Sequence, residues 1–148
     1  MRGSCLFQVV RLLKHGIGAM LRIVYHYSLR AGGVSIGKGT MISLGAKIDL
    51  RRGKIYIGDY CTITHGVVIL SHDAAAAMLG KKSEDITRIE DHVFVGVNSV
   101  ILAGITVGRY AIIGAGSVVT SNIPPYSVAM GNPARVVRQI QGDERNGG

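Results

Sequence analysis

The sequence predicts an all-β fold in which short strands wind into a three-sided parallel β-helix, a prism of stacked coils. The main observation is that an aliphatic residue recurs at six-residue intervals within three blocks. Composition agrees, because 21 glycines supply corners while the core must be filled by Ile, Val and Leu, there being no Trp and only two Phe among 148 residues. The aliphatic anchors are Ile36, Ile42, Ile48, Ile57, Ile63, Ile69, Ile89, Val95, Ile101, Val107, Ile113 and Val119.

A period of six excludes the two commonest patterns of secondary structure. An α-helix would repeat near 3.6 residues and a hairpin sheet near 2. Six residues can instead form one short strand and one corner, so that three units close a coil of about 18 residues. Coils stacked about 4.8 Å apart then place each anchor above the anchor of the preceding coil. The length of the chain fits one such domain.

Two breaks in the period are expected to have structural meaning. The spacing from Ile48 to Ile57 is nine, which predicts a small bulge at residues 51–53. The spacing from Ile69 to Ile89 is twenty, and residues 71–87 lack the repeat. We expect residues 71–87 to form a loop that leaves the prism, and such exceptions in regular solenoids tend to carry function.

Residues 1–32 are predicted to be a basic amphipathic helical segment, with the helix over 5–30. One stripe of this helix carries polar residues at spacings of three, four and seven. Charged residues interrupt the apolar run, so it is too short to span a membrane, and no signal-peptide cleavage site follows. Two interpretations stay open: the helix caps the prism or packs on a neighbouring subunit, or it lies on a membrane surface. The stripe comprises Gln8, Arg11, His15, Arg22 and His26.

Charge and cysteine content restrict the function further. The net charge of +8 is concentrated at the N-terminus, since the first acidic residue is Asp49. No aromatic residues alternate with Lys or Arg, which argues against nucleic acid as a partner. Cys5 and Cys61 form no CxxC motif and indicate neither a disulfide framework nor a zinc knuckle, so we expect a cytoplasmic protein.

The form of the repeat resembles the hexapeptide-repeat acyltransferases, among them the maltose, galactoside and exopolysaccharide O-acetyltransferases. The general form is an aliphatic residue, often followed by Gly or another turn-forming residue, then two variable residues and a small one, and the C-terminal block ends in GNPARVVR. The resemblance covers residues 33–140 and implies a left-handed parallel β-helix acetyltransferase domain. A short helix over 134–139 and a disordered tail at 141–148 are also expected.

The resemblance also implies the catalytic residue. In these acetyltransferases a histidine at the start of the loop, about 13 to 17 residues after an IGD repeat, is catalytic. That pattern occurs here as IGDYCTITHGVVILSHD and implies His72. Acetyl transfer from a thioester to an alcohol needs a general base, which a neutral imidazole provides without a covalent relay. Asp73 and His65 are weaker candidates for binding the acceptor.

The same resemblance implies acetyl-CoA as co-substrate, bound in a groove between two prisms of a homotrimer. Backbone groups of successive coils would bind the pantetheine, and two arginines after the last coil would face phosphate. Ser121 departs from the family pattern, where Lys is frequent. The implied residues are Gly96, Val97, Gly104, Ala115, Thr120, Ser121, Arg135 and Arg138.

The predicted function is O-acetylation of a sugar, in the biosynthesis of exopolysaccharide, capsule or lipopolysaccharide, with contact to the inner face of the membrane through the N-terminal helix left open. Serine O-acetylation and N-acetylation of an amino sugar remain alternatives, as does a non-catalytic repeat scaffold. A zinc-dependent γ-type carbonic anhydrase is disfavoured and no metal is expected. That enzyme needs two ligands five residues apart, whereas His65, His72 and His92 are seven and twenty apart.

Overall fold

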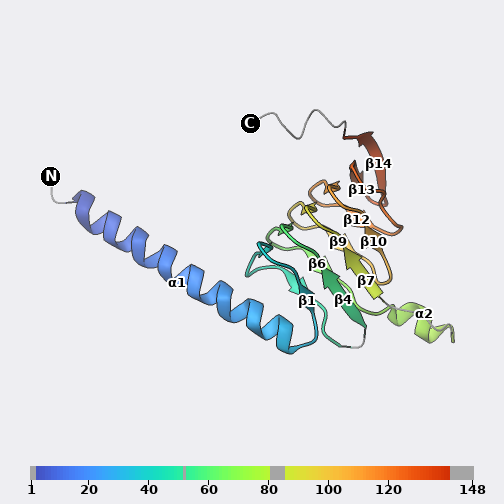
Figure 1. Ribbon diagram of the computed structural model, residues 1–148, viewed down its shortest axis with the longest axis horizontal. Coiled ribbons are helices and arrows are strands. Elements are labelled where there is room, and N and C mark those ends of the chain that lie inside the picture. The colour runs from blue at the N-terminus through green and yellow to red at the C-terminus, as the bar shows by residue number, and fades with distance from the viewer. Residues whose placement is uncertain (1–2, 52, 81–85, 141–148) are drawn as a thin grey trace.

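The computed structural model describes residues 3–51, 53–80 and 86–140 of the chain, so the predicted tail at 141–148 lies outside the described residues. A long helix, α1 (Gly3–Ala31), leads into a column of stacked coils. In Figure 1 the coils follow one another along the column, and α1 extends away from its N-terminal end. The short helix α2 (Ala74–Met78) lies beside the column in the segment that interrupts the repeat.

Three sheets form the sides of the column, and the chain visits them in turn. The first sheet contains β1 (Ser35–Ile36), β4 (Lys54–Ile57), β7 (Ile86–Ile89) and β10 (Thr106–Val107). The second contains β2 (Met41–Ile42), β5 (Thr62–Ile63), β8 (Phe94–Val95), β11 (Ile112–Ile113), β13 (Ser127–Gly131) and β14 (Ala134–Gln139). The third contains β3 (Lys47–Ile48), β6 (Val68–Ile69), β9 (Val100–Ile101) and β12 (Val118–Val119).

The core consists of the predicted aliphatic ladders. Strands of successive coils pair in parallel, and anchors pair with anchors, as Ile42 with Ile63 and Ile63 with Val95. All twelve predicted anchors are buried, none of them more than 8% exposed. The residue before each anchor points outward, so a two-residue strand already presents one side chain to the core. The three-sided prism predicted from the period of six is therefore confirmed.

The corner between the first and second sheets carries a stack of aromatic rings, which we call the ladder corner. After Gly39, the successive coils place Tyr60, His92, Tyr110 and Tyr126 there, each with φ between 53° and 57°. A left-handed backbone costs a non-glycine residue roughly 1–2 kcal/mol. Neighbouring rings lie 4.6 to 5.2 Å apart between centroids and nearly parallel, and aromatic contacts of this kind offset that cost.

The C-terminal end of α1 closes the first coil. Leu29 is buried in the core cluster, and Tyr25 Oη donates a 2.6 Å hydrogen bond to the carbonyl of Ala46. Arg30 Nη2 donates to the carbonyl of Ile36 at 2.9 Å. Without this end of the helix, the aliphatic side chains of the first coil would face water.

The predicted helix over 134–139 is wrong, because these residues form β14, which pairs antiparallel with β13. A helix of six residues is too short to be stable alone. The edge of β13, by contrast, offers a row of hydrogen-bonding groups, and the branched residues Val136 and Val137 favour a strand. The hairpin also buries Ala134.

The predicted loop over residues 71–87 is too long at its C-terminal end. The strand β7 begins at Ile86, where Ile86 and Thr87 pair with Lys54 and Ile55 of the longer strand β4. The bulge predicted at residues 51–53 precedes β4 and allows this strand to start two residues before the usual position. Residues 81–85 and Arg52 lie outside the described part of the chain.

Candidate active site

A carboxylate and an imidazole meet at the corner between the third and first sheets, which we call the loop corner. Asp49 directly follows β3, and His72 follows β6 by three residues, one coil further on. Because Ile48 pairs with Ile69, the two segments leave the third sheet side by side. His72 Nδ1 lies 2.7 Å from Asp49 Oδ2.

The carboxylate of Asp49 is held by several hydrogen bonds. Ser71 donates to Oδ2 from its hydroxyl at 3.0 Å and from its backbone N–H at 3.3 Å. Arg51 donates to Oδ1 from Nε at 2.9 Å and from its backbone N–H at 3.2 Å. The Asp49 side chain is only 7% exposed, whereas that of Arg51 is 74% exposed. The carboxylate is therefore fixed in position before any ligand arrives.

These bonds determine the charge of Asp49 and the tautomer of His72. Burial raises the pKa of Asp49, but hydrogen bonds from Arg51, Ser71 and His72 outweigh burial and hold that pKa well below its usual range. An ionised carboxylate can only accept hydrogen bonds. In the neutral imidazole, the proton in the short contact therefore belongs to Nδ1 of His72, and Nε2 carries the lone pair that a general base requires.

The imidazole borders a small cavity. Its side chain is 18% exposed, and the cavity has a volume of about 190 Å³. Leu70 and Leu102, from the ends of β6 and β9, form an apolar part of the wall. A hydroxyl group bound there would be partly shielded from water, which strengthens its hydrogen bond to a base. The lining residues are Arg51, Leu70, His72, Asp73, Ala74, Leu102 and Ala103.

Asp73, which sequence analysis proposed as a contact to the acceptor, caps a helix in the structure. Its Oδ1 accepts a 2.9 Å hydrogen bond from the backbone N–H of Ala75, so it caps the short helix α2. It also lines the cavity, as a residue that contacts an acceptor would. Of the two aspartates, it is Asp49 that bonds the imidazole ring.

The three histidines considered for zinc lie at three different corners. His65 is at the corner between the second and third sheets, where its ring rests on Gly45: a Cβ added to Gly45 would lie 2.0 Å from His65 Nδ1. His72 is at the loop corner, and His92 stands in the aromatic stack of the ladder corner. The column thus separates them, and they cannot share one zinc ion. Within the described residues no group of His, Cys, Asp and Glu could hold a metal ion.

The residues expected to bind acetyl-CoA fall along both edges of the third sheet. Gly96, Val97 and Ala115 follow β8 and β11, at the corner that precedes this sheet. Gly96 is enclosed, since an added Cβ would lie 2.6 Å from the backbone nitrogen of Ala115. The remaining backbone candidates lie at the loop corner, on the coils that follow His72. These are Gly104, Thr120 and Ser121.

The two predicted phosphate-binding arginines lie on β14 rather than on a helix. Both Arg135 and Arg138 are exposed. The strand β14 contacts β12, the last strand of the third sheet, so the arginines lie near the C-terminal end of the sheet that the other candidates border. Arg135 Nη1 bonds the carbonyl of Ala134 at 2.9 Å.

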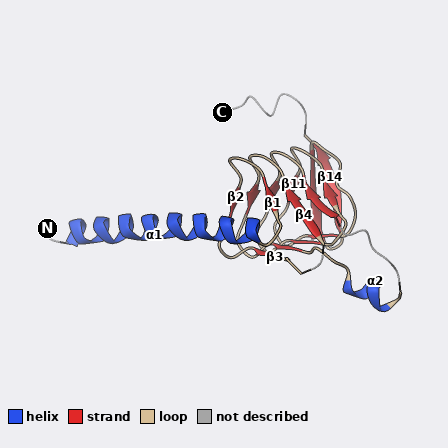
Figure 2. Ribbon diagram, turned by 60° about the horizontal axis from the view of Figure 1, so that its bottom comes forward, coloured by secondary structure: helices blue, strands red, loops and turns tan. Residues whose placement is uncertain are grey.

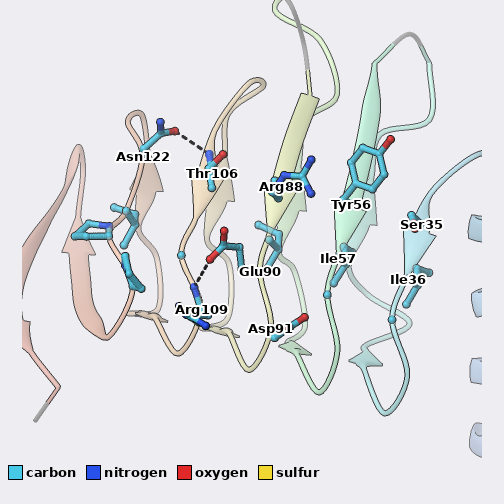
Figure 3. Close-up of a pocket in the computed structure, with 17 residues that line it drawn as sticks. Ser35, Ile36, Tyr56, Ile57, Arg88, Glu90, Asp91, Thr106, Arg109 and Asn122 are labelled. Atoms are coloured by element: carbon cyan, nitrogen blue, oxygen red, sulfur yellow. Dashed lines mark hydrogen bonds between the residues drawn. The ribbon is translucent and has the colours of Figure 1, made fainter. Parts of the chain in front are cut away.

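A larger groove than this cavity lies elsewhere, on the outer face of the first sheet. It has a volume of about 1050 Å³ and is shown in Figure 3. Its polar side chains bond within the protein: Glu90 accepts from the backbone of Arg109 at 2.8 Å, and Asn122 accepts from the backbone of β10. Arg88 lies over the ring of Tyr56. None of the predicted site residues lines this groove, so we place the chemistry at the loop corner.

Comparison with known proteins identifies the family. Residues 86–121 match the family model described as the hexapeptide repeat of succinyl-transferase. By this match and by its column of stacked coils, the chain is a hexapeptide-repeat protein. A predicted acetyltransferase of Schizosaccharomyces pombe is 34% identical over 110 residues, which are 74% of this chain and 45% of the relative. The chain spans less than half the length of the curated relatives that it matches.

Solved hexapeptide-repeat acyltransferases superpose on the column. A maltose O-acetyltransferase of Clostridium difficile 630 is 35% identical with a TM-score of 0.63, covering 74% of this chain and 60% of that one. A Vibrio cholerae acetyltransferase complexed with acetyl coenzyme A is 29% identical with a TM-score of 0.63, covering 74% and 61%. Soybean serine acetyltransferase is 31% identical with a TM-score of 0.58, covering 71% and 40%. The column has the left-handed winding of this acyltransferase fold.

The residue of this candidate site that sequence analysis missed is Asp49. It occupies the position directly after the anchor Ile48, where Gly is the commonest residue and polar residues such as Ser43 and Glu90 also occur, so it resembled an ordinary repeat residue. The register of the coils could have identified it. Ile48 lies one coil below Ile69, so Asp49, directly after Ile48, and His72, three residues after Ile69, leave the sheet at the same corner.

The lowered pKa of Asp49 predicts a specific acid sensitivity. An unfolded Asp titrates near 3.9, so a carboxyl with a lower pKa in the fold stabilises the protein above about pH 4 and loses this contribution as the pH falls further. We expect the free energy of unfolding of the wild type to exceed that of Asp49→Asn at neutral pH, with the difference shrinking below about pH 4. Urea denaturation across this range measures it, and a constant difference would contradict the prediction.

Proposed function

We propose that this chain is an acetyl-CoA-dependent O-acetyltransferase in which His72 acts as general base on the hydroxyl of a sugar. The observation that supports this most directly is the 2.7 Å contact between the ionised carboxylate of Asp49 and Nδ1 of His72, which leaves Nε2 as a proton acceptor beside a cavity. This is the arrangement that an alcohol needs in order to attack a thioester.

The residues of the chain would act in two steps. His72 Nε2 accepts the proton of the acceptor hydroxyl as that oxygen bonds to the acyl carbon, and then returns the proton to the departing sulfur. Asp49 stabilises the imidazolium that exists between the two steps. Acetyl-CoA, when bound, supplies an activated acyl group, so the protein needs no nucleophile of its own.

Acetyl-CoA fits the outer face of the third sheet. The outward side chains of β6, β9 and β12 are Val68, Val100 and Val118, which form a half-buried apolar wall along the column. The backbone candidates border this wall on both sides. Arg135, near its C-terminal end, offers a guanidinium to phosphate.

A homotrimer would supply the other wall of this groove. The outer face of the second sheet carries a row of large apolar side chains, each between 37% and 52% exposed. Such a row on a folded domain indicates a surface that another protein covers. We therefore propose that columns associate and that the donor lies between two of them. The row comprises Met41, Phe94, Ile112 and Met130.

Among the described residues, no helix is both long enough and apolar enough to cross a bilayer. We propose a cytoplasmic enzyme, in which the buried thiol of Cys61 stays unpaired. We also propose that its acceptor is a sugar of an exopolysaccharide, capsule or lipopolysaccharide precursor. A serine hydroxyl or an amino-sugar amine could be activated by the same base.

An assay of thiol release tests the reaction and the acceptor together. Purified protein is mixed with acetyl-CoA and one acceptor at a time: glucosides and galactosides, oligosaccharides, L-serine, or glucosamine. We expect release of the coenzyme A thiol with a sugar hydroxyl and formation of an acetyl ester, seen by mass spectrometry. Turnover with serine or with the amine alone would overturn the sugar assignment, and turnover with none of them would overturn the proposed activity.

A further inference from the structure

The strongest feature that the proposed reaction does not use is the outward face of α1. Six large apolar side chains of its second half are between 47% and 69% exposed. So many adjacent apolar side chains are unusual on a free surface and indicate a site that something covers. They are Ile17, Met20, Leu21, Ile23, Val24 and Tyr27.

These side chains share one side of the helix, away from the column. At about 100° per residue they occupy an arc of roughly 160°. Leu29 and Tyr25, which contact the first coil, lie on the opposite side. In both Figure 1 and Figure 2, α1 extends beyond the N-terminal end of the column. Ile23 and Tyr27, at one border of the arc, also line a cavity with Thr40 and Met41 of the column.

The charge of the helix has one sign. Residues 3–31 contain no Asp or Glu. In the described half, Arg30 lies at one border of the apolar arc, and His26 and Arg22 lie further round on the opposite side of the helix. A wide apolar arc opposite a face with basic and no acidic residues is the pattern of helices that lie in the headgroup region of a membrane with anionic lipids.

We propose that α1 is a membrane-surface anchor, with the face from Ile17 to Tyr27 inserted among the acyl chains of an anionic bilayer and the positive charge of the helix attracted to lipid phosphates. The helix would lie on the bilayer and hold the column, with its loop corner, next to it. This inference is independent of the proposed reaction, because it rests on α1 alone.

A second copy of the chain is the competing occupant, since residues 17, 20, 24 and 27 have the spacing of a coiled-coil seam. Two observations favour the membrane. Leu21 and Ile23 extend the apolar arc to both sides of that seam, where coiled coils usually place charged residues. Residues 3–31 also contain no acidic residue, so two copies of this helix packed together would bring positive charges close with no negative charge to pair with them.

Vesicle flotation with the full chain tests the proposal. The vesicles contain phosphatidylcholine alone or with about 30% phosphatidylglycerol, to supply the negative surface that basic segments bind. The test variant is Val24→Glu, and the matched control is Val137→Glu on β14. These valines have nearly equal exposure, 59% and 56%, so the two variants differ in the surface changed rather than in the chemistry of the change.

We expect the wild type and Val137→Glu to float with anionic vesicles, and Val24→Glu to bind them at least tenfold more weakly. Arg22→Gln and Arg30→Gln combined should weaken binding to anionic vesicles and make it less sensitive to salt. Equal binding of Val24→Glu and wild type, or no binding of the wild type, would overturn the proposal. So would a fall in oligomer mass in Val24→Glu by light scattering without lipid, since the face would then be an interface between copies. Circular dichroism confirms that each variant is folded.

Discussion

The variant His72→Ala is expected to lower kcat by about 10³-fold, within the range of 10² to 10⁴ that a positioned general base contributes. The reason is that we propose Nε2 of His72 as the proton acceptor at the cavity of the loop corner. The side chain lies at the surface of the column and not in its core, so the fold should persist. Steady-state thiol release gives kcat, and calorimetric titration with coenzyme A should show donor binding within about threefold of the wild type.

The variant His65→Ala tests whether the reaction takes place at the loop corner or at the corner between the second and third sheets. It removes an imidazole of the same chemistry from the corner between the second and third sheets, where the ring rests on Gly45. We expect kcat to stay within about threefold of the wild type. If His65→Ala lowered kcat as much as His72→Ala, the loop corner would not be the site of the reaction.

The variant Asp49→Asn is expected to lower kcat by about 10²-fold to 10³-fold while KM for the donor changes little. The amide has the same shape but no charge to stabilise an imidazolium. Its NH₂ group can also face Nδ1, which would move the ring proton to Nε2 and remove the base. The measurement is kcat and KM at saturating acceptor.

Asp73→Asn is the matched control for this carboxylate. Asp73 caps α2 through the N–H of Ala75, and asparagine is an equally good cap. We expect kcat within a few-fold of the wild type. If Asp73→Asn proved as damaging as Asp49→Asn, the carboxylate that supports catalysis would be the sequence neighbour of His72 and not the residue one coil below.

The prism could be predicted from sequence because its period has a single geometric solution. Each anchor, such as Ile63 or Val95, is specified locally by its own six residues, and the stacking repeats that rule. The C-terminal strand β14 does not follow this rule. It forms because β13 has a free edge, a property of the assembled sheet that residues 134–139 do not reveal by themselves.

The proposed catalytic pair shows the same division. His72 could be inferred from the family resemblance together with its place after the last anchor before the repeat breaks. Asp49 could not, because 23 residues separate the two and the three-residue insertion between Ile48 and Ile57 alters the coil length between them. Only the register of Ile48 with Ile69 shows that both segments end at one corner. The contact between them is a tertiary property, and spacing along the chain does not encode it.

The reversal of direction at β14 also affects the solubility of the column. A stack of identical parallel coils would otherwise end in a row of open peptide groups, onto which a second molecule could add its own coils and extend a fibril. On the second sheet, the last strand runs opposite to every other strand, so an incoming parallel coil finds no continuing register. The hairpin is thus a terminator of polymerisation, and a chain truncated before residue 132 should form filaments.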